Sequence, residues 1–183
     1  MSKASRIVVL CEDKAHEVFA CRFLKKGWGI RNRDITIPPY PAGKGSGRKH
    51  VEDRIAMEVR ALRARKASTV LVVVQDADQD SVSQVHSFLD SKIEPPRSSS
   101  EQIAFIVPKW HIETWIAYLD GKVVDECESQ TYRNYYSAIC VTKQAHAYVD
   151  KLAGSCTESK PLHSPPDSLS IACKEFERIR NAL

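Results

Sequence analysis

The clearest structural signal in the chain is the segment Thr69-Val70-Leu71-Val72-Val73-Val74-Gln75-Asp76-Ala77-Asp78-Gln79-Asp80. Its first six residues are β-branched or apolar without alternation, which is typical of a strand buried on both faces of a parallel sheet. The run is much too short to span a membrane. It ends in acids at every second position, and ligands of open α/β sheets bind just past the carboxyl ends of the strands. We therefore expect a parallel sheet with an acidic site at one edge.

Strands and helices alternate on both sides of this segment, which predicts parallel crossovers and a three-layer α/β sandwich around a mostly parallel four-stranded sheet. The predicted strands lie at residues 7–11, 35–37, 69–74 and 103–107, and the predicted helices at residues 14–26, 51–62, 81–91 and 112–119. After Gly121 the pattern loosens, with two more helical stripes near residues 145–152 and 168–179. We divide the chain into an α/β core, residues 1–120, and a helical C-terminal extension, residues 121–183.

Charge is distributed unevenly along the chain. Residues 1–66 contain 16 Lys and Arg against 7 Asp and Glu, a net of +9, and residues 67–183 contain 11 against 16, a net of −5. A basic segment beside an acidic centre suits a polyanionic partner, whereas a solvated helix face explains the same cations more simply. With no long apolar segment, no signal-peptide core and no C-x-x-C pair among the six cysteines, we expect a cytoplasmic protein with reduced thiols and no membrane contact.

Acidic residues follow three of the predicted strands. Glu12 follows the first strand, Asp76, Asp78 and Asp80 follow the central one, and Glu113 lies near the start of the helix after the fourth. Crowded carboxylates repel one another, and a hard cation such as Mg²⁺ or Mn²⁺ relieves that repulsion. We predict a metal site formed by Glu12, Asp76, Asp78 and Asp80. A polar turn that caps the next helix explains the aspartates equally well, and the helix dipole alone explains Glu113.

Cations flank these acids. The segment 41–50 carries three glycines at alternate positions and leads into a helix, whose first N–H groups favour anions. It has no Walker A pattern. We predict phosphate contacts by Lys44, Arg48 and Lys49, and a surface loop without a ligand is the alternative. Lys109, just after the fourth strand, is a candidate to stabilise a phosphoryl transition state.

The chemistry that suits a carboxylate cluster in basic surroundings is metal-assisted phosphodiester cleavage, in which one or two ions polarise the phosphate and activate water. The predicted catalytic residues are Glu12, Asp76, Asp78, Glu113 and Lys109, with Glu12 as general base or metal bridge. Two other functions stay open. One is a non-catalytic binding module, and the other is a small-molecule phosphotransferase, phosphatase or phosphoacceptor.

An acid that ends the first strand, followed by D-x-D or D-x-D-x-D at the end of a later strand, resembles a TOPRIM domain, the metal-binding module of topoisomerases, primases and OLD-type nucleases. The chain also resembles small stand-alone TOPRIM-like proteins of bacteria. That likeness rests on Cys11-Glu12-Asp13-Lys14, Gly43-Lys44-Gly45-Ser46-Gly47, Asp76-Ala77-Asp78, Ile112-Glu113-Thr114-Trp115 and the closing Ser168-Leu169 helix. It covers most of residues 6–120 and implies a Rossmann-like sheet whose metal is bound by Glu12, Asp76 and Asp78.

Two positions depart from the OLD-type pattern. Asp13 stands where those nucleases usually have Gly, and His16 stands where they carry a second Glu. From its position alone, His16 is more often a surface or packing residue than a functional one. The resemblance also implies a setting, because such proteins often accompany an ABC-type or AAA-type ATPase in anti-phage defence operons. It therefore implies a toxic nuclease that acts on DNA or RNA beside an ATPase partner.

Overall fold

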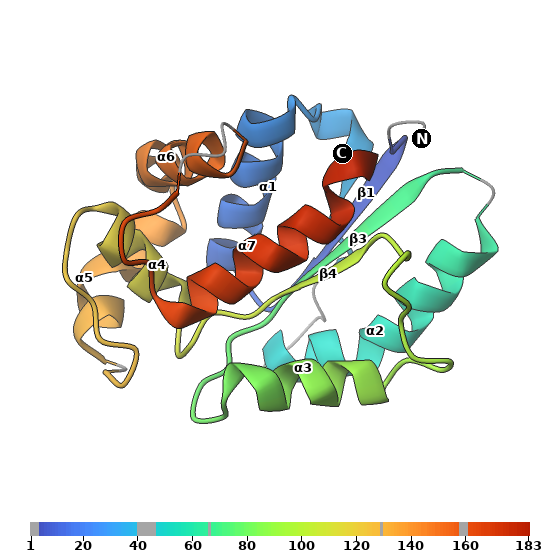
Figure 1. Cartoon of the computed structure of the whole chain (residues 1–183), viewed down its shortest axis with the longest axis horizontal. Helices are drawn as coiled ribbons and strands as arrows, with labels where there is room; N and C mark the ends of the chain where they lie inside the picture. The colour runs from blue at the N-terminus through green and yellow to red at the C-terminus, as the bar shows by residue number, and fades with distance from the viewer. Residues whose placement is uncertain (1–3, 40–46, 66, 129, 158–160) are drawn as a thin grey trace.

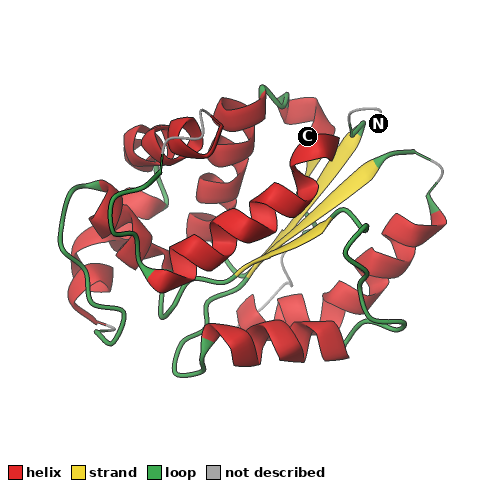
Figure 2. Ribbon diagram, viewed as in Figure 1, coloured by secondary structure: helices red, strands yellow, loops and turns green. Residues whose placement is uncertain are grey.

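The sheet of the protein is entirely parallel. A computed structural model describes residues 4–39, 47–65, 67–128, 130–157 and 161–183. The four strands of the sheet are β1 (Arg6–Cys11), β2 (Ile35–Thr36), β3 (Thr69–Val74) and β4 (Ile103–Ile106), in the order β2-β1-β3-β4 (Figures 1 and 2). All six residues of β3 are buried, as its uninterrupted apolar run predicts. The predicted α/β class and the four parallel strands are confirmed.

Helices cover both faces of the sheet and make three layers (Figure 1). One face packs on α2 (Gly47–Ala64) and α3 (Val82–Ser91). The other face carries α1 and the helices that follow β4: α1 (Lys14–Trp28), α4 (Ile112–Leu119), α5 (Gln130–Cys140), α6 (His146–Thr157) and α7 (Asp167–Ile179). Successive strand residues alternate between the two hydrophobic clusters because side chains of a strand point to opposite faces.

The first helix is longer than the sequence predicts. It runs through Gly27 and ends after Trp28, where Gly29 adopts the left-handed conformation with φ 67° and its N–H bonds back to the helix. A Cβ built on Gly27 would lie 3.4 Å from Cγ2 of Thr157 and 3.7 Å from the Cβ of Ala153, which are ordinary contacts, so α6 packs against this turn of α1. Tertiary packing thus outweighs the low helix propensity of glycine at this position.

The C-terminal helix α7 closes the edge of the sheet at β4. The backbone N–H of Phe105 donates to Glu175 Oε2 at 2.9 Å, and Arg97 pairs with the same carboxylate at 2.6 Å. At the start of α7, Ser168 accepts a hydrogen bond from the Trp115 indole at 2.7 Å. Residues beyond 120 therefore share the core of the α/β layers and protect an otherwise unpaired strand edge. In the described ranges, no helix is both long and apolar enough to cross a membrane.

Candidate functional site

The acids after β1 and β3 meet at the carboxyl edge of the sheet. Cys11 of β1 pairs with Val74 of β3 at the end of the ladder. Glu12 and Asp76 therefore follow two neighbouring strands at about the same level along the strand direction. Asp76 is buried, and its charge and that of Asp78 act directly on Glu12. The expected convergence of Glu12, Asp76 and Asp78 is therefore what the topology produces.

Two histidines hold the carboxylate of Asp76. His16, from the first turn of α1, places Nε2 2.9 Å from Asp76 Oδ1, and His111, directly before α4, places Nδ1 3.5 Å from Oδ2. Both rings are almost completely buried. His16 is positioned by its own helix start, because its backbone N–H donates to the capping side chain of Asp13 at 3.0 Å. His16 is thus part of the site, and His111 is a residue that the sequence did not single out, although it follows a strand end.

Charge in this cluster is redistributed by burial and by the ion pairs. Burial raises the pKa of Glu12 more than the charge of His16 lowers it, and with repulsion from Asp76 the value reaches about 8. Burial would lower the pKa of His16, but the charge and hydrogen bond of Asp76 outweigh it and raise the value to about 10. Burial opposes ionisation of Asp76 as well, yet the two histidines hold its pKa below the ordinary range. At neutral pH the cluster therefore holds an ionised Asp76, a charged His16 and a Glu12 that keeps its proton.

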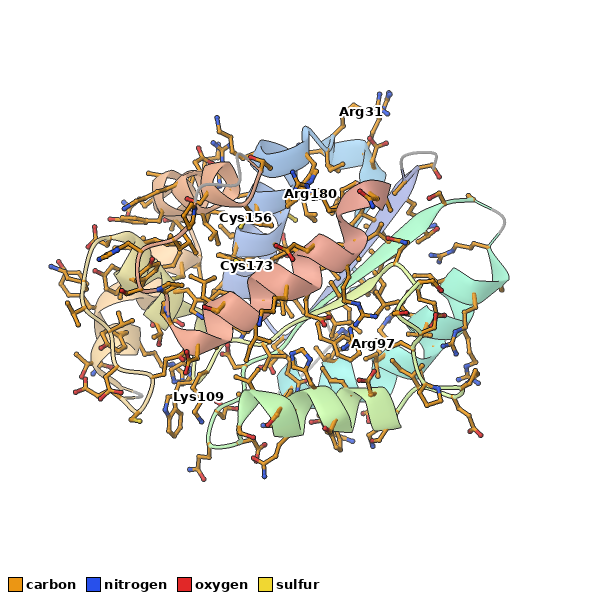
Figure 3. The ribbon with its side chains drawn as sticks, in the orientation of Figure 1. Arg31, Arg97, Lys109, Cys156, Cys173 and Arg180 are labelled. Carbon is orange, nitrogen blue, oxygen red and sulfur yellow. The ribbon has the colours of Figure 1, made fainter. Side chains whose placement is uncertain are left out.

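The loops after β3 and β4 are tied together next to the acids. Asp78 and Trp110 both adopt left-handed backbone conformations, with φ 50° and 61°, and form one antiparallel bridge. The ammonium group of Lys109, a residue labelled in Figure 3, donates to the carbonyl oxygens of Asp78 and Asp80, at 2.8 and 2.7 Å. Such conformations are costly for non-glycine residues and persist only when the surroundings enforce them. Lys109 therefore fixes the loop that presents Asp78 and Asp80.

The start of α2 lies against the end of β1. A Cβ built on Gly47 would sit 2.3 Å from the carbonyl oxygen of Glu12, so only glycine allows this approach. Next along the helix, Arg48 pairs with Asp80 at 2.7 Å and lies 3.8 Å from Asp78. Lys49 is exposed and pairs with Asp53 on the same helix. The third predicted phosphate-binding residue, Lys44, lies outside the described residues.

A depression opens beside Asp78 and Asp80. It is lined by two arginines, two aspartates, an indole and an imidazole, with one amide: Arg48, Arg133, Asp78, Asp80, Trp110, His111 and Gln79. Arg133 comes from α5, is exposed and forms no ion pair within the described residues. The Nε2 atom of His111 and the Nε1 atom of Trp110 are buried there without a hydrogen-bond partner. Glu113 takes no part in this depression, because it is buried on α4 and accepts a hydrogen bond from Ser137 on α5.

The carboxylate oxygens of the site are of the type that divalent cations bind. Glu12 Oε1 is buried without a hydrogen-bond partner, and repulsion from Asp76 and Asp78 contributes to its raised pKa. Hard cations take such oxygen ligands. The ligand set is not preformed, since both oxygens of Asp76 face histidines. Across the described ranges, no three His, Cys, Asp or Glu side chains are arranged to hold a metal.

Comparison of the chain with protein-family models, with curated proteins and with solved structures finds no match to any of them. The geometry of this edge of the sheet is therefore the basis for assigning a function. Its central feature is the half-buried carboxyl group of Glu12 beside a carboxylate that two histidines keep ionised.

Proposed function

We propose that the protein is a metal-dependent phosphodiesterase that hydrolyses nucleic acid, either DNA or RNA. The observation that carries this proposal is the position of Glu12, which follows β1 beside Asp76 at the carboxyl edge of the sheet and has one buried, unpartnered oxygen, Oε1. Partial burial raises its pKa to about 8. A general base works best when its pKa lies near the working pH. In its ionised form, Glu12 can therefore take a proton from an attacking water and return it to the leaving oxygen.

The other residues have supporting roles in the proposal. Glu12, Asp76, Asp78 and Asp80 would hold Mg²⁺ or Mn²⁺, which when bound polarises the phosphate and lowers the pKa of water. His16 and His111 keep Asp76 ionised and oriented through their contacts of 2.9 and 3.5 Å. Arg48 and Arg133 line the adjacent depression, where they would contact the phosphate backbone.

A second candidate is a binding module without turnover. It is favoured by the pairing of Asp76 with two histidines, which leaves this acid less open to a metal. The phosphoacceptor alternative has weaker support, because the same pairing and the burial of Asp76 restrict access to a phosphodonor. Cytoplasmic action as a toxic effector in anti-phage defence, with an ATPase partner, is proposed on the resemblance to small TOPRIM-like proteins alone.

The direct test is a cleavage assay on duplex DNA, single-stranded DNA and folded RNA with Mg²⁺ or Mn²⁺. Glu12→Gln removes the base while keeping its shape, and loss of general base catalysis typically lowers the rate by about 10²- to 10⁴-fold. Glu94→Gln is the matched control, because Glu94 is exposed and remote from the site. Equal rates for wild type and Glu12→Gln would refute the assignment of the base. Binding of nucleic acid without cleavage by the wild type would favour the second candidate.

Metal binding is tested separately by thermal unfolding with and without Mn²⁺. A ligand at 100 times its Kd stabilises the native state by about 2.7 kcal/mol, which shifts the unfolding midpoint by a few degrees. We expect this shift for the wild type and not for Asp76→Asn/Asp78→Asn, and removal of the ion with EDTA should reverse it. A shift of equal size in both proteins would place the metal elsewhere.

A further inference from the structure

Two cysteine thiols lie in contact far from the acidic site. Cys156 belongs to α6 and Cys173 to α7, and their sulfur atoms are 3.6 Å apart (Figure 3). All six cysteines fall within the described ranges, and none of them is in a disulfide. Both members of the pair are half-buried, so the pair is neither sealed in the core nor fully exposed. The proposed nuclease chemistry uses neither of them.

A cavity gives small molecules access to this pair. Its volume is about 410 Å³, within the range that holds small organic ligands. Its lining includes both cysteines and combines the apolar Trp28, Leu162 and Phe176 with the charged Glu177 and Arg180. A ligand with an apolar sulfur-containing centre and charged ends would find both kinds of contact there.

The two thiols share a proton unequally. Donation from the Cys156 thiol favours the thiolate of Cys173 and lowers its pKa, despite the opposing effect of burial. The same hydrogen bond, followed by burial, raises the pKa of Cys156 well above the ordinary range. Because the thiolate is the nucleophile in thiol chemistry, Cys173 is the better attacking group and Cys156 the better resolving group.

We propose that Cys156 and Cys173 form a thiol-exchange site that reacts with a low-molecular-weight disulfide and closes to an intramolecular disulfide between α6 and α7. The 3.6 Å contact, the half-burial of both residues and the adjoining cavity carry this inference. It does not depend on the proposed nuclease function.

The exchange proceeds in two balanced steps. Cys173 attacks one sulfur of the disulfide RSSR, which forms a mixed disulfide and expels RS⁻. Cys156 then gives up its proton and attacks Cys173 Sγ, which expels a second RS⁻. In total, two protein thiols and one RSSR become one protein disulfide and two RSH, so the protein loses two electrons and RSSR gains them. Closure brings the sulfur atoms from 3.6 Å to the bond length of about 2.05 Å.

The test treats the full chain with oxidised glutathione and follows the intact mass and the linked peptides. Cys21 and Cys127, which are more accessible than the buried Cys11 and Cys140, are replaced by serine to remove competing reactions. In this background we expect the loss of two hydrogens and a peptide that joins Cys156 to Cys173. Added Cys156→Ser should trap glutathione on Cys173, because the introduced hydroxyl can still donate a hydrogen bond but cannot resolve the mixed disulfide.

The reciprocal variant makes the assignment of roles falsifiable. With Cys173→Ser, glutathione should add to Cys156 several-fold more slowly than it adds to Cys173 in the Cys156→Ser variant. Equal trapping rates would overturn the assigned roles, and a persistent mixed disulfide in the parent background would overturn the closing step. Far-ultraviolet circular dichroism establishes that each variant is folded before treatment.

Discussion

Replacing Glu12 with glutamine should stabilise the protein above neutral pH. The folded-state pKa of Glu12 is about 8, against an ordinary 4.5, chiefly because burial disfavours the charged form. The folded state therefore holds a proton that the unfolded state has released between these two values. Stability must fall as pH rises through this window, and glutamine, which does not ionise, removes this loss.

The size of the effect follows from the shift. Moving from 4.5 to about 8, at about 1.36 kcal/mol for each pKa unit, corresponds to ~5 kcal/mol when Glu12 is fully ionised in both states. His16 and Asp76 titrate together with Glu12, so part of this energy is shared among the three groups. We expect the variant to gain ~2–4 kcal/mol relative to wild type between pH 5 and pH 9.

The assay is urea unfolding of both proteins at pH 5, 7 and 9 in EDTA. His16, with a folded-state pKa of about 10, also makes stability fall as pH rises, and it does so in both proteins. The difference between the two curves therefore reports Glu12 together with its coupling to His16. Glu94→Gln, on an exposed side chain, should follow wild type throughout. Parallel curves for wild type and Glu12→Gln would show that the folded state does not raise the pKa of Glu12 and would remove support for its role as base.

Two further substitutions test the packing around the site and the sheet edge. Gly47→Ala places a Cβ 2.3 Å from the Glu12 carbonyl oxygen, so we expect urea unfolding to show a loss of ~1–3 kcal/mol and cleavage to fall. Gly154→Ala, where a Cβ meets nothing within 4 Å, should be neutral or stabilising. If Gly154→Ala lost as much stability as Gly47→Ala, the clash with Glu12 would not explain the loss at position 47. Glu175→Ala removes one of the two carboxylates that pair with Arg97, the other being Asp90, and leaves the Phe105 N–H without its acceptor, which should cost ~1–3 kcal/mol in the same assay. A loss below ~1 kcal/mol would mean that the ion pair does not hold α7 on β4.

The site residues that were not predicted from the sequence reach the site through contacts between distant parts of the chain. His16 and Asp76 are 60 positions apart, and no periodicity links them. His111 occupies the N-cap position of α4 but its side chain makes no capping hydrogen bond, so it gives no helix-start signal. Arg133 lies in α5, a helix that was not predicted from the sequence. A strand end was the one local feature that could have drawn attention to His111.

Local sequence patterns were enough to predict the architecture, whereas the meeting of the acids depended on the order of the strands, which only the tertiary structure decided. The unbroken apolar run 69–74 specified a strand buried on both faces, and alternation with helices specified parallel crossovers. Since parallel strands present their carboxyl ends at one edge, Glu12 and Asp76 had to converge once β1 and β3 were neighbours. The charges that these acids carry could not be predicted in this way. The protonation state of each acid depends on its burial and on its partners, and both come from segments that are brought together only in the folded chain. The two histidines keep Asp76 ionised, whereas burial keeps Glu12 protonated.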